Sequence, residues 1–426
     1  SMMAEIFHRN GINTERVLCI IDLDQEVGIG VRANHNLLRP AHLFMHLKQN
    51  NYDALTRSTD YLILRQVQNK EWNFPPSHAR RYNLMLEEIC DSYAKFAAIL
   101  EREYIFAWLD WDGDNVLANA GIIDYGSVRQ FGLRHDQYRY DDIERFSTNL
   151  NEQRGKARLI IQVFAQLVDY LNTHSKKPLK DFKQSRILKQ FDKKFEYYSL
   201  DRLLFQLGFN SKQRNKLLKK NISAVKSFYR DYLALEKAKT FKKLCKVPDG
   251  VNRPAILNMR KFIRLTINFY AQQNGPLDSR RFPAKDLYKE ILSISASNKD
   301  FRFTHDVAGK LIRLQDKLKY LIHQCSPKKG CKTLLKQMQS NVHHINKDDR
   351  ITGNALLYIV HEVMAHRKKG LQHSEVQKII DNFIESQVTL PAEAKIASPK
   401  HKITNSQSKK LAKTMLTIID GHKEDI

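Results

Sequence analysis

The stretch from residue 84 to residue 126 constrains the fold most, because its hydrophobic period changes abruptly from helical to strand-like. Leu84, Tyr93 and Leu100 belong to an apolar stripe with the helical period, which predicts one amphipathic helix. Residues 104–108, Tyr-Ile-Phe-Ala-Trp, follow directly and predict a short strand. A helix followed at once by a strand predicts an α+β fold for this part of the chain.

An acidic loop and a tight hairpin come next. Residues 110–115 read Asp-Trp-Asp-Gly-Asp-Asn, and residues 116–123 predict two short strands joined by a turn, ahead of Asp124-Tyr125-Gly126. A tight hairpin would bring Asp124 back close to Asn115. Mg²⁺ beside a transferring phosphate is held by a few hard oxygen ligands. Asn115 and Asp124 are therefore the predicted metal ligands.

The spacing within this segment also matches protein-kinase loops. Asp110 stands five residues before Asn115, which is the D-x4-N spacing of a kinase catalytic loop, and residues 124–126 stand where D-F-G would. The alternative is a solvated acidic turn followed by a chance Asp-Tyr-Gly. Each triplet alone is a weak signal, but the loop, the hairpin and the second acid in this order favour phosphate chemistry.

With these residues in place, the sequence resembles the selenoprotein O family of protein-kinase-like adenylyltransferases. Family members carry an Asp-Asn pair nine residues before D-Y-G, and Asp114-Asn115 and Asp124 match that spacing. Arg32 and Arg39 match two arginines of the family that are spaced seven apart.

The resemblance extends over roughly residues 4–170. Residues 13–18 look like the family's segment after helix C, and residues 60–63, Asp-Tyr-Leu-Ile, resemble its D-Y-V-I. Between these segments, residues 17–21 and 27–31 are short β-rich runs that predict a hairpin.

The resemblance implies a kinase-like fold that binds ATP in a flipped orientation and transfers AMP to a protein hydroxyl. Asn115 and Asp124 would ligate Mg²⁺, and Asp114 would act as a base or an orienting group. Arg32 and Arg39 would grip phosphates, for which guanidinium forks are well suited. The alternative for the two arginines is simple surface solvation.

At three points the sequence departs from the family. Trp108 replaces a family His, so any role of that imidazole is lost. Asp110 stands where family members typically lack the kinase catalytic Asp, which makes it a catalytic candidate beside Asp114 and keeps phosphate transfer open. The Gly-rich loop and the strand lysine that would contact nucleotide phosphates are not seen, and Gly28-Ile29-Gly30 is no substitute. We therefore expect an incomplete nucleotide lobe.

Three domains are predicted in a chain that is α+β but mostly α. Residues 1–65 would be a remnant of a kinase-like N-lobe, residues 66–246 a kinase-like C-lobe with the catalytic and metal loops, and residues 247–426 a helical extension. One helix is predicted over residues 215–238. Residues 391–409, rich in Ser, Lys and Pro, predict a linker before a last short helix.

Charge is divided unevenly along the chain. Residues 1–150 carry 16 Lys and Arg against 21 Asp and Glu, whereas residues 151–426 carry 55 against 25. The basic part has three interpretations: solvated helix faces, binding to a nucleic-acid backbone, or docking of an acidic protein substrate. No nucleic-acid recognition motif supports the second.

The leading functional prediction is Mg²⁺-dependent transfer of AMP from ATP to Ser, Thr or Tyr hydroxyls of proteins. The alternatives are a catalytically inactive, pseudokinase-type binding protein or a protein kinase, and thirdly a nucleic-acid binder that uses the basic extension. Five cysteines without framework spacing fit a reducing compartment. No apolar run reaches the roughly 18 residues of a spanning helix. We therefore expect a cytoplasmic protein with no membrane partner.

Overall fold

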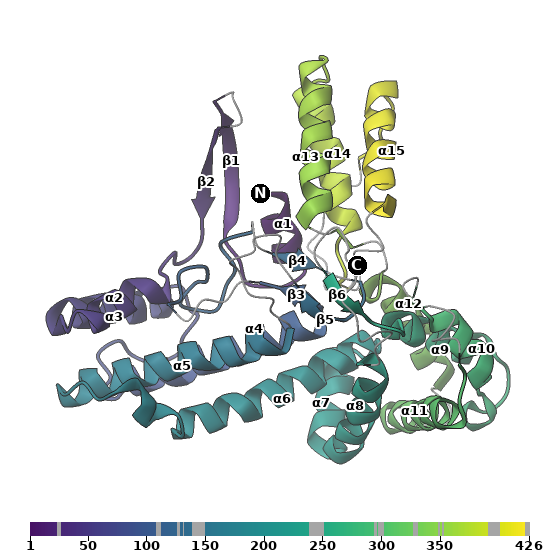
Figure 1. The fold of residues 1–426 in the computed structure, drawn as a ribbon, viewed down its shortest axis with the longest axis horizontal. Coiled ribbons are helices and arrows are strands. Elements are labelled where there is room, and N and C mark those ends of the chain that lie inside the picture. Colours follow the sequence, from purple (N-terminus) through teal and green to yellow (C-terminus); the bar gives the residue numbers. More distant parts are fainter. Residues whose placement is uncertain are drawn as a thin grey trace. The chain divides into compact units, whose positions relative to one another are not determined.

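The protein is mostly helical in the computed structural model (Figure 1). Within the described residues it contains fifteen α-helices and six short strands, so the predicted α+β, mostly α class is confirmed. None of the described helices is long and apolar enough to cross a membrane. The structure describes residues 1–23, 27–107, 112–125, 128–130, 132–138, 150–237, 251–293, 296, 302–326, 331–347, 350–351, 353–390 and 401–421.

The chain divides into two units. The first comprises residues 1–101, 105–128 and 151–199, and the second comprises residues 102–104, 129–150 and 200–426. Helix α6 begins in the first unit and ends in the second. The predicted domain boundaries at residues 65 and 246 stay predictions.

The helices and strands of the first unit are α1 (Met2–Arg9), β1 (Arg16–Asp22), β2 (Gly28–Ala33), α2 (Pro40–Lys48), α3 (Tyr52–Gln68), α4 (Arg81–Arg102), β3 (Ile105–Phe106), α5 (Leu150–Thr173), the short 3-10 helix η1 (Leu179–Phe182) and the start of α6 (Arg186–Gln206). Those of the second unit are β4 (Arg129–Gln130), β5 (His135–Tyr138), α7 (Ser211–Lys220), α8 (Ile222–Glu236), β6 (Val251–Pro254), α9 (Met259–Gln272), η2 (Leu277–Ser279), α10 (Ala284–Ile291), α11 (His305–Cys325), α12 (Cys331–Ile345), α13 (Gly353–Lys368), α14 (His373–Ser386) and α15 (Ser406–Gly421).

In the first unit, polar contacts at helix surfaces join α4, α5 and α6. Asp91 of α4 accepts hydrogen bonds from Lys194 Nζ at 2.6 Å and from Tyr198 Oη at 2.7 Å, both on α6. Asp192 of α6 accepts from Arg154 of α5 at 2.8 Å. These three long helices therefore form one packed group.

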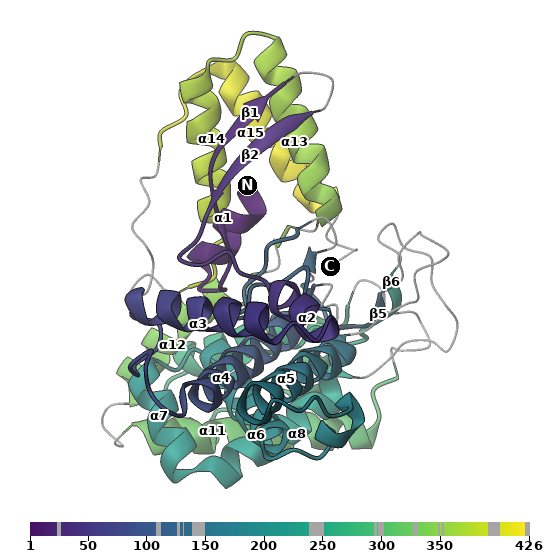
Figure 2. The ribbon, with the colours of Figure 1, turned by 90° about the vertical axis from the view of Figure 1, so that its left-hand side faces the viewer.

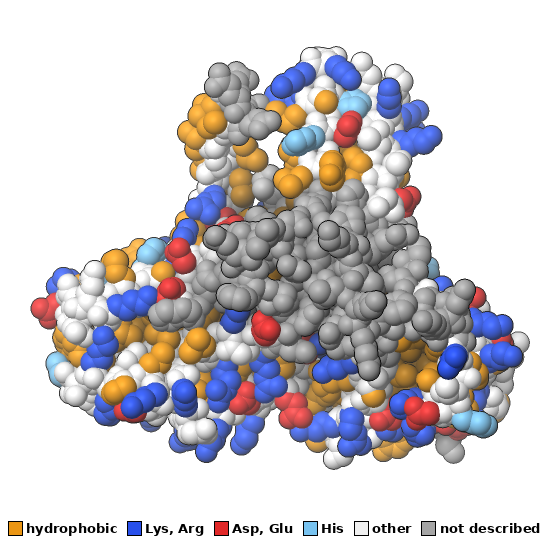
Figure 3. All heavy atoms as spheres, in the orientation of Figure 1, with side chains coloured by type: hydrophobic (Ala, Val, Ile, Leu, Met, Phe, Trp, Pro, Cys, Tyr) orange, Lys and Arg blue, Asp and Glu red, His pale blue; other side chains and the backbone are white. Residues whose placement is uncertain are grey.

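The hairpin predicted at residues 17–31 is present as β1 and β2, which pair antiparallel with Ile20 opposite Gly30. Its apolar side chains are exposed: Leu18 to 68%, Ile20 to 59% and Ile29 to 50%. Figure 3 shows hydrophobic side chains along it. The hairpin is therefore held by its own ladder and not by burial of its faces.

Two helices stand where the sequence predicts one over residues 215–238. Asn221 separates α7 from α8 with backbone angles of φ −132° and ψ 26°, outside the helical range. Asn has a low helix propensity because its short amide competes for nearby backbone groups. The prediction of a single helix is therefore wrong, since the apolar period alone does not register a break of one residue.

The second unit has a continuous apolar core that draws on α6 to α12. Gly208, just after α6, lets α12 approach closely: its φ is +88°, and a Cβ there would lie 2.9 Å from the carbonyl oxygen of Met338. The same approach allows Gln337 and Asn341 of α12 to donate to the Gly208 carbonyl at 2.9 and 3.0 Å. A glycine is required at this position, because a side chain would clash with backbone.

The last three helices, α13, α14 and α15, lie side by side (Figure 2). Ser408 of α15 donates to Glu375 of α14 at 3.1 Å. Because α15 begins at Ser406, the linker predicted to reach residue 409 ends earlier, and residues 391–400 of that linker lie outside the described residues.

A buried carboxylate in the second unit contacts three arginines. Glu103, fully buried, accepts from Arg202 Nε at 2.6 Å, from Arg260 Nη2 at 3.1 Å and from Arg350 Nη1 at 2.9 Å. The three arginines come from α6, from α9 and from the segment after α12. One side chain therefore ties together parts of the chain that are far apart in sequence.

A second buried carboxylate lies on α8. Glu236 accepts two hydrogen bonds from Arg102, at 2.8 and 3.1 Å, and one from Tyr104 Oη at 2.5 Å. Arg134 approaches it at 3.5 Å. Burial alone would raise the pKa of both Glu103 and Glu236, but the neighbouring guanidiniums outweigh it and hold both pKa values below the usual range.

Glu103→Gln is expected to lower the free energy of unfolding by about 3–5 kcal/mol, because it leaves buried guanidiniums without their carboxylate. Urea denaturation followed by far-UV circular dichroism measures this change. Glu290→Gln is the matched control: Glu290 is half-exposed and pairs with Lys261 at 3.3 Å, so its loss should change stability by at most about 0.5 kcal/mol. Equal effects of the two variants would contradict the central role of Glu103.

The stabilisation from Glu103 should also depend on pH. A carboxyl whose pKa is lowered by folding stabilises the protein above its unfolded pKa of about 4.3 and loses that contribution as the pH falls through the folded value. The difference in unfolding free energy between the wild type and Glu103→Gln should be constant above about pH 5 and shrink below about pH 4. A difference that grows towards acid would contradict the lowered pKa.

Candidate functional site

The tight turn that the sequence predicts after the acidic loop is present, but a single isolated bridge stands in place of the two predicted short strands. Val116 and Ile122 form an antiparallel bridge, Leu117 N donates to Gly121 O at 2.8 Å, and Ala120 N donates to Leu117 O at 2.9 Å. Ala120, inside the turn, has a φ of +63°. The chain therefore reverses direction within seven residues.

The reversal sets the positions of the predicted metal ligands. Asn115 directly precedes the bridged Val116, and Asp124 stands two residues beyond Ile122. Asp114 stands two residues before Val116, so Asp114 and Asp124 both lie on the side of the bridge away from the turn. Asp114 and Asp124 are exposed and Asn115 is half-buried. The predicted metal-binding side chains thus lie at the open end of the hairpin, where a metal ion or nucleotide from solution can reach them.

Among the hydrogen bonds that join the hairpin to the rest of the first unit, one reaches the segment before α2 and one comes from α4. Ala118 N donates to Leu38 O at 2.8 Å, in the segment before α2. Tyr93 of α4, completely buried, donates its hydroxyl to Leu117 O at 2.9 Å. The hairpin is therefore anchored to a rigid helix, as precise placement of ligands requires.

The acidic loop packs against the start of α2 at Gly113. Its φ is +71°, and a Cβ on it would lie 2.3 Å from the Cβ of Pro40. Ala41 N donates to Gly113 O at 3.3 Å. Gly113 thus fixes the direction in which Asp112 and Asp114, its two neighbours, leave the loop.

Both of these aspartates pair with cations around α2. Asp114 accepts from Arg39 Nη1 at 3.0 Å, and Asp112 accepts from Lys48 Nζ at 2.5 Å. The side chain of Asp114 is 62% exposed and that of Arg39 is 31% exposed. Because the pair is open to solvent, another anion can replace Asp114 as the partner of Arg39 at little cost in free energy. The structure therefore brings together two of the predicted site residues, Arg39 and Asp114.

Arg32, the other predicted phosphate-binding arginine, contacts a different acid. Its Nη1 lies 3.2 Å from Glu15 Oε1 and 3.5 Å from the carbonyl oxygen of Ile123, the residue before Asp124. Arg32 is 44% exposed, whereas the Glu15 side chain is 2% exposed. Arg32 thus reaches the same end of the hairpin as Asp124 does, from the strand β2.

Glu15 is a site residue that the sequence predictions missed. Burial raises its pKa, and Arg32 opposes that shift without cancelling it. Within the part of the chain that the structure describes, its second carboxylate oxygen, Oε2, has no hydrogen-bond partner. No spacing or charge pattern marks Glu15, because its proximity to the hairpin arises from the pairing of Thr14 with Ile122.

Tyr125 of the Asp-Tyr-Gly triplet is half-buried. Its hydroxyl contacts Thr14 Oγ1 and donates to Ile122 O at 3.3 Å, and its ring lies 6.3 Å from that of Phe7 of α1. Burial raises the pKa of this phenol. Tyr125 is therefore a packing residue that turns the neighbouring Asp124 outward.

Three of the singled-out residues, Trp108, Asp110 and Gly126, lie outside the described residues, so the position of the second catalytic candidate, Asp110, stays a prediction. Within the described ranges, no group of three or more His, Cys, Asp and Glu side chains is placed to hold a metal ion. Asn115 and Asp124 offer two hard oxygen donors. That number suits Mg²⁺, which usually takes one or two protein ligands and completes its shell with phosphate oxygens and water.

Comparison with known proteins adds no assignment. No family model matches the chain, and a search of curated proteins gives no match either. The resemblance to the selenoprotein O family therefore stays a hypothesis that rests on the motif residues themselves.

Gly113→Ala should lower the free energy of unfolding by about 2 kcal/mol or more, because the new methyl group meets Pro40 and the positive φ is unfavourable for alanine. Thermal and urea denaturation measure the change. Gly155→Ala in α5 is the matched control: a Cβ there meets no heavy atom within 4 Å, so stability should stay equal or rise by about 0.5–1 kcal/mol. A Gly113 variant as stable as the wild type would contradict the proposed packing of the acidic loop.

Proposed function

We propose that the chain is a selenoprotein O-like adenylyltransferase that transfers AMP from ATP to Ser, Thr or Tyr hydroxyls of proteins. The observation that carries the proposal is the hairpin, which returns Asp124 to the same end as Asp114 and Asn115. Arg39 and Arg32 reach that end from two further segments. Oxygen ligands and guanidiniums at one place are what nucleotide chemistry needs.

In this proposal Asn115 and Asp124 hold Mg²⁺, which offsets the negative charge of the ATP phosphates. The acceptor hydroxyl oxygen attacks the α-phosphorus, the bond from that phosphorus to the bridging oxygen of the β-phosphate breaks, and pyrophosphate leaves. Asp114 takes the hydroxyl proton or orients the hydroxyl. Arg39, paired with Asp114 in the structure, moves to the phosphates and thereby releases the Asp114 carboxylate for this role.

A catalytically inactive binding protein is the second candidate. It is favoured by the arginine contacts, since Arg39 and Arg32 each contact a carboxylate. The two candidates differ in ATP binding, which the inactive protein is expected to lack. A nucleic-acid binder finds less support, because Lys and Arg side chains on the described part of the surface in Figure 3 are interspersed with acids and do not gather in one stripe.

ATP binding in the presence of Mg²⁺ should be measurable by isothermal titration calorimetry and should weaken roughly 10- to 100-fold in Asp124→Ala, the effect of losing one charged contact. Asp112→Asn is the matched control. It removes a carboxylate from the acidic loop, but the carboxylate of Asp112 pairs with Lys48. Unchanged affinity in Asp124→Ala, or equal loss in both variants, would argue against a nucleotide site at the hairpin.

Transfer should be visible as label from α-³²P-ATP on proteins of a soluble extract incubated with the wild type, and it should be absent with Asp124→Ala. Label from γ-³²P-ATP alone would identify a protein kinase instead. The absence of both ATP binding and label would support the inactive binding protein.

A further inference from the structure

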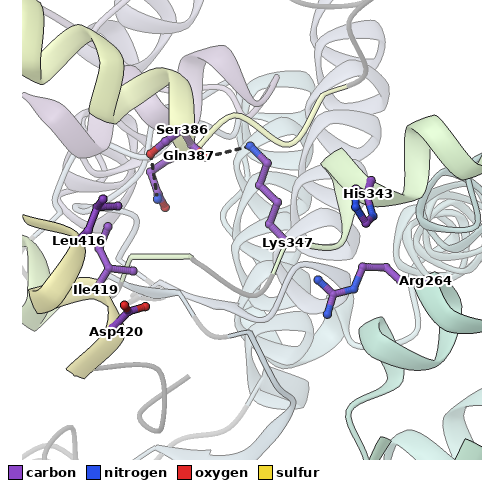
Figure 4. Close-up of a pocket in the computed structure, with 8 residues that line it drawn as sticks. All are labelled: Arg264, His343, Lys347, Ser386, Gln387, Leu416, Ile419 and Asp420. Carbon is purple, nitrogen blue, oxygen red and sulfur yellow. Dashed lines mark hydrogen bonds between the residues drawn. The ribbon is translucent and has the colours of Figure 1, made fainter. Parts of the chain in front are cut away.

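In the pocket of the second unit that Figure 4 shows, a lysine is already engaged by the protein itself. Arg264 and Lys347 line this pocket, and Lys347 Nζ donates to Ser386 O at 2.8 Å and to Val388 O at 2.9 Å. The ammonium of Lys347 is therefore occupied by backbone carbonyls. A pocket in the first unit has a different character.

The pocket in the first unit has a volume of about 610 Å³ and lies at the C-terminal end of α3, in the segment that leads to α4. Ligand pockets of proteins have volumes of about 300–1,000 Å³. The residues that line it are Val67, Lys70, Trp72, Asn73, Phe74 and Pro75. None of them takes part in the proposed adenylyl transfer, so the pocket can have a role of its own.

Backbone hydrogen bonds shape this pocket before any ligand arrives. Lys70 N donates to Val67 O at 2.9 Å, and Glu71 N donates to Gln66 O at 2.9 Å. These two bonds are the Schellman pattern, in which the chain folds back on the last turn of a helix. The end of α3 therefore positions the pocket walls in advance, which lowers the entropic cost of binding a ligand.

A lysine occupies the position of this motif that usually holds a glycine. Lys70 has a φ of +61°, in the left-handed region that a Cβ makes unfavourable. Residues in such backbone conformations cluster at functional sites. A glycine would form the same turn without strain, but it would provide no ammonium. Lys70 thus gives the pocket a positive charge at the cost of some backbone strain.

The charge of Lys70 is available to a ligand. Its side chain is exposed, and among the residues that the structure describes none forms an ion pair or a hydrogen bond with Lys70 Nζ. The adjacent acid, Glu71, has its Oε1 3.1 Å from His35 Nδ1. An anion in the pocket would therefore not have to displace a carboxylate from Lys70.

The rest of the lining is mainly apolar and aromatic. Trp72 is 5% exposed and Phe74 is half-buried, and their ring centroids are 5.8 Å apart with planes inclined by 18°. Val67 and Pro75 add aliphatic surface. Nearly parallel rings offer a surface on which a planar ring can stack. Asn73 is exposed and adds an amide that can donate and accept hydrogen bonds.

We propose that this pocket binds a small aromatic carboxylate, with its ring against Trp72 and Phe74 and its carboxylate on Lys70. Among the six lining residues, all within the described ranges, Lys70 alone carries a charge. One ammonium matches the single charge of a carboxylate, whereas a phosphate group is better matched by a guanidinium fork. The site does not depend on the nucleotide site proposed at the hairpin.

Indole-3-acetate is the probe, and indole-3-acetamide is its neutral control. Isothermal titration calorimetry with the full chain should show saturable binding of indole-3-acetate. Its affinity should be at least about tenfold higher than that of the amide, which is the effect of one charged hydrogen bond. No saturable binding of indole-3-acetate, or equal affinity for the two compounds, would overturn the proposal.

Lys70→Gly removes the ammonium from the pocket and preserves the turn. Because glycine adopts a φ of +61° without strain, the melting temperature of the variant should stay equal or rise. Its affinity for indole-3-acetate should fall at least about tenfold. A folded Lys70→Gly variant that binds indole-3-acetate as tightly as the wild type would overturn the proposal.

Matched controls separate the pocket from general electrostatics and from the hairpin. Lys95→Ala removes an exposed lysine from α4 of the same unit, outside the pocket lining, and should leave binding unchanged. Equal loss in Lys95→Ala and Lys70→Gly would indicate non-specific attraction and overturn the proposal. Asp124→Ala should also bind indole-3-acetate normally, and loss of binding there would overturn the proposal by placing the probe at the hairpin.

Discussion

The packing of the second unit depends on the ion pairs of the buried Glu103 carboxylate. Three guanidiniums converge on it from α6, from α9 and from the segment after α12. Removing a charge from water is costly, and only close opposite charges with good hydrogen bonds offset that cost. If one partner is missing, a buried charge is left uncompensated and the fold is destabilised. The cluster therefore determines which segments must pack together. Glu236, with Arg102 and Tyr104, repeats the arrangement on α8.

In the first unit a short hairpin has the corresponding role in the proposed site. Its turn brings Asp114 and Asp124 to the same side of one backbone bridge, and hydrogen bonds with the buried Tyr93 hydroxyl and the Leu38 carbonyl hold the hairpin in place. Gly113 sets the direction of the acidic loop against Pro40. Rigid support of this kind lowers the entropic cost of positioning a ligand, and precise positioning is what the proposed phosphate chemistry requires.

Much of the fold could be predicted from periodicity, and the errors have physical reasons. The hairpins at residues 17–31 and 116–122 were predictable because turn residues and β-rich runs are local signals. The helix break at Asn221 was not predictable, because one residue with non-helical backbone angles leaves the apolar period almost unchanged. Of the candidate site, Asn115 and Asp124 could be proposed from their spacing, and Asp114 and Arg39 only from the resemblance. Glu15 was not singled out, since it reaches the hairpin through the bridge between Thr14 and Ile122.

The sequence by itself determined the helical class, the two hairpins and the order of acids that suggests nucleotide chemistry, because these depend on neighbours within a few residues. Only the tertiary structure decided that Asp114 pairs with Arg39, that Glu103 collects three arginines, and that Arg264 and Lys347 line one pocket. Those pairings join residues far apart in the chain. Such contacts form only when core packing brings particular helices together, and local sequence patterns do not show which helices will pack against each other.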